Sequence, residues 1–108
     1  MAAKSVFGLS TVELERLVRK RASLTANVRL TNHVLVRMKQ RHIAREEVFD
    51  VLSHGRLART PEPNAAKGSL ECRMQRFMAG RELAVVAAVS DDDPSVIVVT
   101  VIVLDKGG

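Results

Sequence analysis

One histidine and two arginines recur at helical spacing within the segment TNHVLVRMKQRHI, residues 31–43. At 100° per residue, with His33 at zero, Arg37 falls at about 40° and Arg41 at about 80°, so the three side chains share one helix face. Histidine can transfer a proton near neutral pH while arginines hold negative charge, and this combination suits phosphate chemistry. The alternative is the ordinary solvated face of an amphipathic helix.

Three residues farther along the chain are candidate contacts for an anion. In a strand pattern of period 2, Arg73 projects from the face opposite Leu70 and Met74, where it would give an anion a second rigid anchor. Thr100 is polar within the apolar run VIVVTVIVL, and Lys67 lies in a loop ahead of the Arg73 strand. The alternatives are a cross-strand ion pair for Arg73, a backbone hydrogen bond for Thr100 and simple solvation for Lys67.

The remaining chemistry-bearing residues do not predict a metal site. His33, His42 and His54 lack compact ligand spacing, and Cys72 has no CxxC partner. The three aspartates at residues 91–93 precede a proline, where turn chemistry accounts for them. Cys72 falls on the apolar face of its strand, where a thiol is usually inert packing. We therefore expect neither a metal nor another cofactor.

The charge balance favours a polyanionic partner, and the alternative is that arginine serves here only as a soluble helix former. The chain has 17 Lys plus Arg against 12 Asp plus Glu, a formal net charge of +5 and a pI near 10.1. Residues 1–60 contain 12 basic and 5 acidic side chains, and residues 61–108 contain 5 and 7. Aromatic residues make up 3% and all are phenylalanine, so base stacking would be scarce and any nucleic acid would be held mainly through its phosphates.

The composition predicts a soluble cytoplasmic protein without a membrane contact. A single cysteine cannot form an intramolecular disulfide, which favours a reducing compartment. The longest apolar stretch, residues 96–104, is about half a membrane span. The N-terminal residues lack the apolar core of a signal peptide.

Helices are expected in the first half of the chain. Ser10 followed by Glu13 is a capping box, and it predicts a helix that ends at the basic cluster of residues 19–21. Thr31 or Asn32 can cap the helix of residues 31–43. A second helix follows it directly.

That second helix is predicted over residues 44–54, with Gly55 as its C-terminal stop. From Ser69 the apolar period changes from 3.6 to 2, which indicates strands. The predicted strands are residues 27–30, 56–60, 69–78, 83–89 and 96–104. The continuous apolarity of the last two predicts burial on both faces. The predicted core consists of Val34, Leu35, Met38, Val48, Val51, Leu52, Val85, Val86, Val99 and Val101.

The expected architecture is α+β, with helices first and an antiparallel meander after them. Residues 1–26 would form an N-terminal extension with one helix, residues 27–104 the α+β domain and residues 105–108 a tail. The helices would cover one face of a curved sheet, and His33, Arg37 and Arg73 would face one concave side.

The order of these motifs resembles a known group of small bacterial domains. A helix with HxxxRMxxR, a helix ending in His-Gly, a strand containing ECRM and an apolar VVTV strand are similar to domains of unknown function grouped with the BrnT and RelE ribonuclease toxins. The resemblance spans roughly residues 28–103 and depends on His33, Arg37, Met38, Arg41, residues 48–55, Arg73 and residues 99–101. It implies helices packed on a curved antiparallel sheet and metal-independent RNA cleavage, restrained by an antitoxin.

The sequence therefore predicts a toxin-type endoribonuclease that cleaves RNA by attack of the ribose 2′-hydroxyl. His33 would be the general acid or base, and Arg37 and Arg73 would stabilise the charge that develops on the phosphate. Arg41, Lys67 and Thr100 would bind the RNA. The alternative is a non-catalytic binding protein of phage or mobile-element type, which uses the same fold to bind a protein or a nucleic acid.

Overall fold

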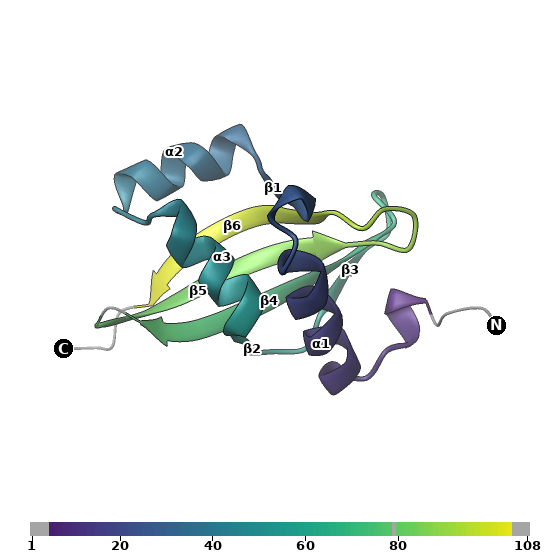
Figure 1. The fold of residues 1–108 in the computed structure, drawn as a ribbon. Helices are drawn as coiled ribbons and strands as arrows, with labels where there is room; N and C mark the ends of the chain where they lie inside the picture. Colours follow the sequence, from purple (N-terminus) through teal and green to yellow (C-terminus); the bar gives the residue numbers. More distant parts are fainter. Residues whose placement is uncertain (1–4, 79, 105–108) are drawn as a thin grey trace.

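Helices occupy the first half of the chain and most strands the second half, as the change of period at Ser69 predicts. The computed structural model describes residues 5–78 and 80–104 (Figure 1). The elements are η1 (Val6–Gly8), α1 (Thr11–Ala22), η2 (Thr25–Asn27), β1 (Val28–Leu30), α2 (Asn32–Gln40), α3 (Arg45–His54), β2 (Arg56–Leu57), β3 (Glu62–Asn64), β4 (Ser69–Met78), β5 (Arg81–Val89) and β6 (Val96–Leu104). The fold class is α+β, and the predicted tail at residues 105–108 lies outside the described residues.

The strands form one curved sheet in the order β1-β6-β5-β4-β2, with β3 paired to β4. The meander β4-β5-β6 is antiparallel, as the sequence predicts. β1 pairs in parallel with β6, with Val28 opposite Val96, so the sheet is mixed and the expectation of a purely antiparallel sheet is wrong. The parallel pairing is possible because a long connection, which includes α2 and α3, separates β1 from β6 in the sequence.

The helices leave one face of the sheet uncovered. In Figure 1, α1 and α3 cross in front of the sheet, while α2 runs beside β6. The core lies beneath the helices and is built from Leu14, Val18, Val34, Met38, Val48, Val51, Leu52, Leu70, Cys72, Met74, Leu83, Val85, Val98 and Val101. The opposite side, here called the open face, presents Glu71, Arg73 and Gln75 of β4, Ala84, Val86 and Ala88 of β5, and Ile97, Thr100 and Ile102 of β6.

Helix α1 is joined to the same core as the rest of the chain. Its Leu14, Val18 and Ala22 are buried in the main cluster. Its polar side chains also bind distant backbone: the Glu15 carboxylate accepts a hydrogen bond from the Leu57 N–H at 2.7 Å, and Arg19 donates to the Gly55 carbonyl at 2.8 Å. No helix of the described residues is long and apolar enough to cross a membrane.

Local capping sets the ends of the helices. The predicted capping box is present, because the Ser10 hydroxyl accepts from the Glu13 N–H and the Glu13 carboxylate accepts from the Ser10 N–H. Thr31 caps α2 through the Val34 N–H. Helix α2 ends at Gln40, three residues before its predicted end.

The early end of α2 is a Schellman motif centred on a histidine. His42 has φ 54°, the left-handed region that glycine usually occupies. The Ile43 N–H donates to the Met38 carbonyl at 2.9 Å and the His42 N–H donates to the Lys39 carbonyl at 3.4 Å. Ile43 and Met38 are both buried in the same core cluster, as is usual for the apolar residues that flank this motif.

The fold is expected to be more stable with glycine than with histidine at position 42. The His42→Gly variant should raise the free energy of unfolding by about 0.5–1 kcal/mol, because glycine adopts a positive φ without steric cost. The matched control is His33→Gly within α2, which should lower stability by up to about 1 kcal/mol through lost helix propensity. Urea unfolding measures both variants, and equal signs for the two changes would contradict this explanation.

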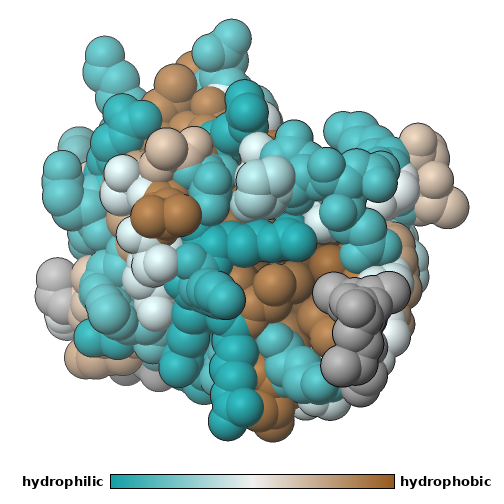
Figure 2. All heavy atoms as spheres, turned by 45° about the vertical axis from the view of Figure 1, so that its right-hand side comes forward, coloured by the Kyte–Doolittle hydropathy of each residue, from teal (hydrophilic) through white to brown (hydrophobic). Residues whose placement is uncertain are grey.

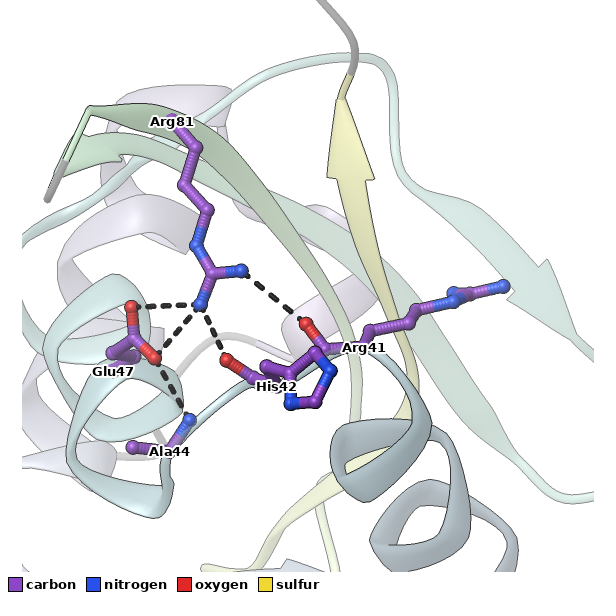
Figure 3. A network of polar contacts seen from close by, with 5 residues as sticks. All are labelled: Arg41, His42, Ala44, Glu47 and Arg81. Atoms are coloured by element: carbon purple, nitrogen blue, oxygen red, sulfur yellow. Dashed lines mark hydrogen bonds and ion pairs between the residues drawn. The ribbon is translucent and has the colours of Figure 1, made fainter.

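An arginine from the sheet holds the corner between α2 and α3 (Figure 3). Arg81 donates to the backbone carbonyls of Arg41 and His42 at 3.3 and 2.7 Å, and to the Glu47 carboxylate at 3.0 and 3.1 Å. Glu47 also accepts from the Ala44 N–H at 2.8 Å. The Ala44 hydrogen bond, followed by the Arg81 contact, holds the pKa of Glu47 below its usual value. The sequence predicts only a hairpin at Arg81. The contacts of Arg81 with the α2–α3 corner, here called the Arg81 clamp, join distant segments of the chain.

Three packing expectations need correction. Leu35 is 43% exposed instead of buried, because α2 faces the core along a narrow seam through Val34 and Met38. Val99 is only half-buried, because β6 has a bulge opposite Val86 and Ala87. Strand β5 is buried on both faces, but β6 is not: its Ile97 is 39% exposed on the open face.

Candidate functional site

The side chains of His33, Arg37 and Arg41, here called the stripe, follow one another along α2 from solvent to the edge of the sheet. His33 is exposed in the first turn and Arg37 is half-buried one turn later. Arg41, at the C-cap, donates from Nη1 to the Val101 carbonyl at 2.6 Å. At 1.5 Å per residue, His33 and Arg41 lie about 12 Å apart along the helix. The stripe therefore lies beside the part of the β6 edge that is not paired with β1.

Arg73 and Thr100 lie in one row across the open face. Arg73 pairs with Val86 on β5, and Val86 pairs with Thr100 on β6. Since neighbouring strands are about 4.8 Å apart, the backbones of Arg73 and Thr100 are separated by about 10 Å. Arg41 reaches the carbonyl of the residue after Thr100. The structure thus brings Arg41, Thr100 and Arg73 along one line. The expectation that His33, Arg37 and Arg73 face one concave side is not met, because Arg73 lies on the open face, whereas α2, which carries His33 and Arg37, packs into the core on the other face.

The arginines of this line are not neutralised by carboxylates. Five of the other nine arginines form ion pairs at 3.0–3.5 Å: Arg19 with Glu15, Arg56 with Glu82, Arg59 with Glu62, Arg76 with Asp50 and Arg81 with Glu47. Within the described part of the chain, Arg37, Arg41 and Arg73 make no ion pair. The cross-strand ion pair considered for Arg73 does not form, because Glu82 binds Arg56 and Gln75 instead. The Arg73 Nε is buried without a hydrogen-bond partner.

A long acid-free segment surrounds these cations. Residues 16–45 contain nine Lys or Arg residues and no Asp or Glu. The segment includes the end of α1, β1 and all of α2. The basic residues in the last turn of α2, Arg37 and Lys39, also oppose the negative end of the helix dipole, which is the structural alternative to a ligand-binding role.

A small pocket lies at one end of the open face, beside the β5–β6 turn. It has a volume of about 170 Å³ and its wall includes Lys67, Ser69, Glu71, Ala88, Ser95 and Ile97; we call it the serine pocket. Arg29 of β1 donates to the Ser95 hydroxyl at 2.8 Å. The exposed Lys67 side chain is at the rim, so one of the RNA-binding residues predicted from the sequence lies at this pocket.

The aspartate run of residues 91–93 has structural roles. Asp91 accepts from the Ser5 hydroxyl at 2.6 Å and from the Val6 N–H at 2.8 Å. Asp93 accepts from the Ser95 N–H at 2.7 Å, an Asx turn, and the Ser95 hydrogen bonds hold the pKa of Asp93 below its usual value. The turn interpretation of these aspartates is therefore confirmed.

The other candidate groups lie apart from the open face. Burial raises the pKa of the Cys72 thiol to about 12, which agrees with its predicted role as inert packing. His42 is at the α2–α3 corner, and His54 lies 3.8 Å from Asp50 at the end of α3. Over residues 5–78 and 80–104, no group of three His, Cys, Asp or Glu side chains could hold a metal ion.

A wider groove of about 620 Å³ lies between the N-terminal segment, α1 and Asp91. Its apolar floor contains Val6, Leu9 and Leu17, and Arg16 and Lys20 are at its border. Figure 2 shows hydrophilic side chains over most of this side of the molecule, with a hydrophobic hollow between them. None of the candidate residues predicted from the sequence lines this groove.

The profile described as "Domain of unknown function (DUF4258)" matches residues 30–103. The chain belongs to this family. The DUF4258 match includes α2, α3, strands β2 to β5 and nearly all of β6, and therefore every candidate residue from His33 to Thr100, while α1 precedes it. No curated protein and no solved structure matches the chain.

Sequence reasoning missed the residues that surround the serine pocket. Glu71 was placed on the same strand face as Arg73 by the period of β4, but no role was expected for it. Arg29 and Ser95 lie far apart in the sequence, and only the parallel pairing of β1 with β6 brings them together. The hydroxyl-rich end of the strands, with Ser69, Ser90 and Ser95, is the one local signal that was available.

Proposed function

We propose that this DUF4258 domain is a metal-independent endoribonuclease related to the BrnT and RelE toxins, which binds RNA along α2 and across the open face. The observation that carries the proposal is the set of cations without carboxylate partners, with Arg37 and Arg41 on the same helix as the exposed His33 and Arg73 on the open face. Five of the other nine arginines, in contrast, form an ion pair with a carboxylate of the fold. A phosphate backbone supplies the missing negative charge.

The proposed path of the RNA follows the row of cations. A strand that crosses β6 meets Arg41 at the sheet edge, Thr100 on the open face and then Arg73 of β4. Because these residues are spread over more than 10 Å, they contact successive phosphates instead of one. Lys67, at the other end of the open face, extends the positive border of this path.

Cleavage requires proton transfer at the ribose and at the leaving oxygen. The 2′-hydroxyl loses its proton as its oxygen bonds to phosphorus, and the bond between phosphorus and the 5′ oxygen of the next nucleotide breaks as that oxygen gains a proton. His33 serves as the general acid or base for one of these protons, because its imidazole is exposed on the stripe, and solvent water accepts or donates the other. Arg37 follows by one helical turn and stabilises the charge on the phosphorus oxygens. The products are a 2′,3′-cyclic phosphate and a 5′-hydroxyl.

Salt dependence tests the binding half of the proposal. The affinity of the wild-type protein for a single-stranded RNA should fall steeply as salt rises, because bound phosphates release counterions. Removing two phosphate contacts in the Arg37→Ala, Arg73→Ala variant should reduce the slope of log affinity against log salt by about 1.4. Fluorescence anisotropy at several salt concentrations gives this slope.

The matched control removes the same charge from α3 and the β2–β3 loop. The Arg45→Ala, Arg59→Ala variant should keep the wild-type slope, since Arg45 lies over the Phe49 ring and Arg59 pairs with Glu62. Affinity that does not change with salt, or equal slopes for the two double variants, would contradict binding by Arg37 and Arg73.

A second candidate is a non-catalytic module that binds a protein partner. The exposed apolar side chains of α2 favour it: Leu35 and Val36 are 43% and 55% exposed. Expression of the chain in bacteria separates the two functions. Growth arrest that His33→Ala relieves supports the nuclease, whereas normal growth and a stable co-purifying partner support the binding module.

A further inference from the structure

The serine pocket adjoins the proposed RNA path. The row Glu71, Ala88 and Ile97 is the row of outward-facing residues next to Arg73, Val86 and Thr100 on the same open face. A nucleotide whose phosphate contacts Arg73 therefore has its base within reach of the pocket.

Two polar groups of the pocket lack adequate partners within the fold. The Glu71 carboxylate accepts one long hydrogen bond, from Asn64 Nδ2 at 3.5 Å, and makes no ion pair with any described residue. Ser69 is 8% exposed, and its Oγ has no hydrogen-bond partner. A buried hydroxyl without a partner costs roughly 1–3 kcal/mol, and native folds usually satisfy such groups. Both groups are next to one hollow, so one ligand can satisfy them together.

The shape of the hollow limits that ligand to a small, partly apolar molecule. Its volume of about 170 Å³ is below the about 300–1,000 Å³ of pockets for drug-sized ligands. Ala88, Ile97 and Val99 supply apolar wall, while Glu71, Ser69 and Lys67 supply polar groups. A single planar ring system with hydrogen bonds at its edge fits this combination.

We propose that the serine pocket binds a guanine base of the RNA and gives the domain a preference for guanosine at one position. Both oxygens of the Glu71 carboxylate accept hydrogen bonds, and guanine presents two adjacent donors, N1–H and the N2 amino group, on its Watson–Crick edge. Adenine, cytosine and uracil each lack this adjacent pair. Lys67 or Ser69 donates to guanine O6, the remaining acceptor on that edge.

The proposed function supplies one part of this inference, namely that the guanine base belongs to an RNA. The match between guanine and the polar groups of the pocket does not depend on it. Overall RNA affinity still comes from phosphate contacts, and the pocket adds discrimination at a single nucleotide. A guanine base could also come from a free nucleotide, and the experiment below distinguishes the two sources.

The first measurement is a titration of isotope-labelled protein with the nucleoside monophosphates GMP, IMP, AMP, CMP and UMP, followed by NMR. We expect GMP to shift the backbone signals of Ser69, Glu71 and Ile97, and to bind roughly tenfold or more tightly than AMP. IMP, which lacks the N2 amino group, should bind more weakly than GMP. Glu71→Gln should abolish the preference, and the control Glu46→Gln on α3 should retain it. Equal binding of GMP and AMP, no shift at the pocket, or an unchanged preference in Glu71→Gln would overturn the inference.

The second measurement compares oligouridylate with the same oligonucleotide carrying one guanosine. The guanosine should raise affinity in wild type and in Glu46→Gln, but not in Glu71→Gln, and the oligonucleotide should bind more tightly than GMP. If oligouridylate does not bind while GMP binds the pocket, the proposed function fails and the guanine pocket stands for a free nucleotide. If oligouridylate binds with salt dependence while guanosine adds nothing, the guanine pocket fails and the proposed function stands.

Discussion

RNA cleavage by the His33→Ala variant is expected to be roughly a hundredfold slower than cleavage by the wild-type protein. The imidazole is exposed on α2 and supplies the proton transfer that the 2′-hydroxyl attack needs. The fold should not change, because His33 contributes nothing to the core, and the free energy of unfolding should stay within about 0.5 kcal/mol of wild type. Rates are measured under single-turnover conditions with labelled RNA.

The matched control for this change is His54→Ala. His54 is also an exposed histidine, but it lies at the end of α3 beside Asp50. Its removal should leave the cleavage rate within a factor of about two of the wild-type rate. This factor corresponds to only a fraction of about 1 kcal/mol in the activation free energy. Equal rates for wild type and His33→Ala would remove His33 from the mechanism.

Gly55→Ala is expected to lower the free energy of unfolding by about 3 kcal/mol or more. Gly55 is buried where α3 meets β4, and a Cβ there would lie 2.3 Å from the Val51 carbonyl oxygen and 2.8 Å from the Gln75 carbonyl oxygen. Both neighbours are backbone atoms, so relief requires the last turn of α3 to distort around Val51 and to move away from Gln75 of β4. Arg19, which donates to the Gly55 carbonyl, would lose its hydrogen bond in the same movement.

Gly8→Ala is the control for this prediction. A Cβ at Gly8 meets nothing within 4 Å, so stability should change by no more than about 0.5 kcal/mol. Thermal and urea unfolding of both variants check the difference. Similar stabilities for the two alanine variants would show that close approach of the backbone at Gly55 is not required.

Local patterns predicted the elements well because their causes are local. The capping box at Ser10, the period of 2 in β4 and the helical spacing of His33 and Arg37 each act within a few residues. The sequence therefore predicted that Arg73 points away from the apolar face of its strand. It also predicted the central position of β5 from continuous apolarity.

Long-range contacts account for what could not be predicted. Gly55 was expected only as the C-terminal stop of α3, but its φ is −74° and its small size is required by the close approach of the Val51 and Gln75 carbonyls. The Arg81 contacts and the parallel pairing of β1 each join segments 34 or more residues apart, which no local pattern indicates. Leu35 was misplaced because the width of the apolar seam on α2 depends on which elements cover it.

The most direct test of the proposed function is incubation of the purified protein with RNA in the presence of EDTA, followed by analysis of the product ends. The proposed mechanism predicts cleavage that EDTA does not inhibit, with 2′,3′-cyclic phosphate and 5′-hydroxyl ends that His33→Ala fails to produce. RNA that stays intact with and without added divalent metal would contradict catalysis, and His33, Arg37 and Arg73 would then be assigned to the binding of a partner.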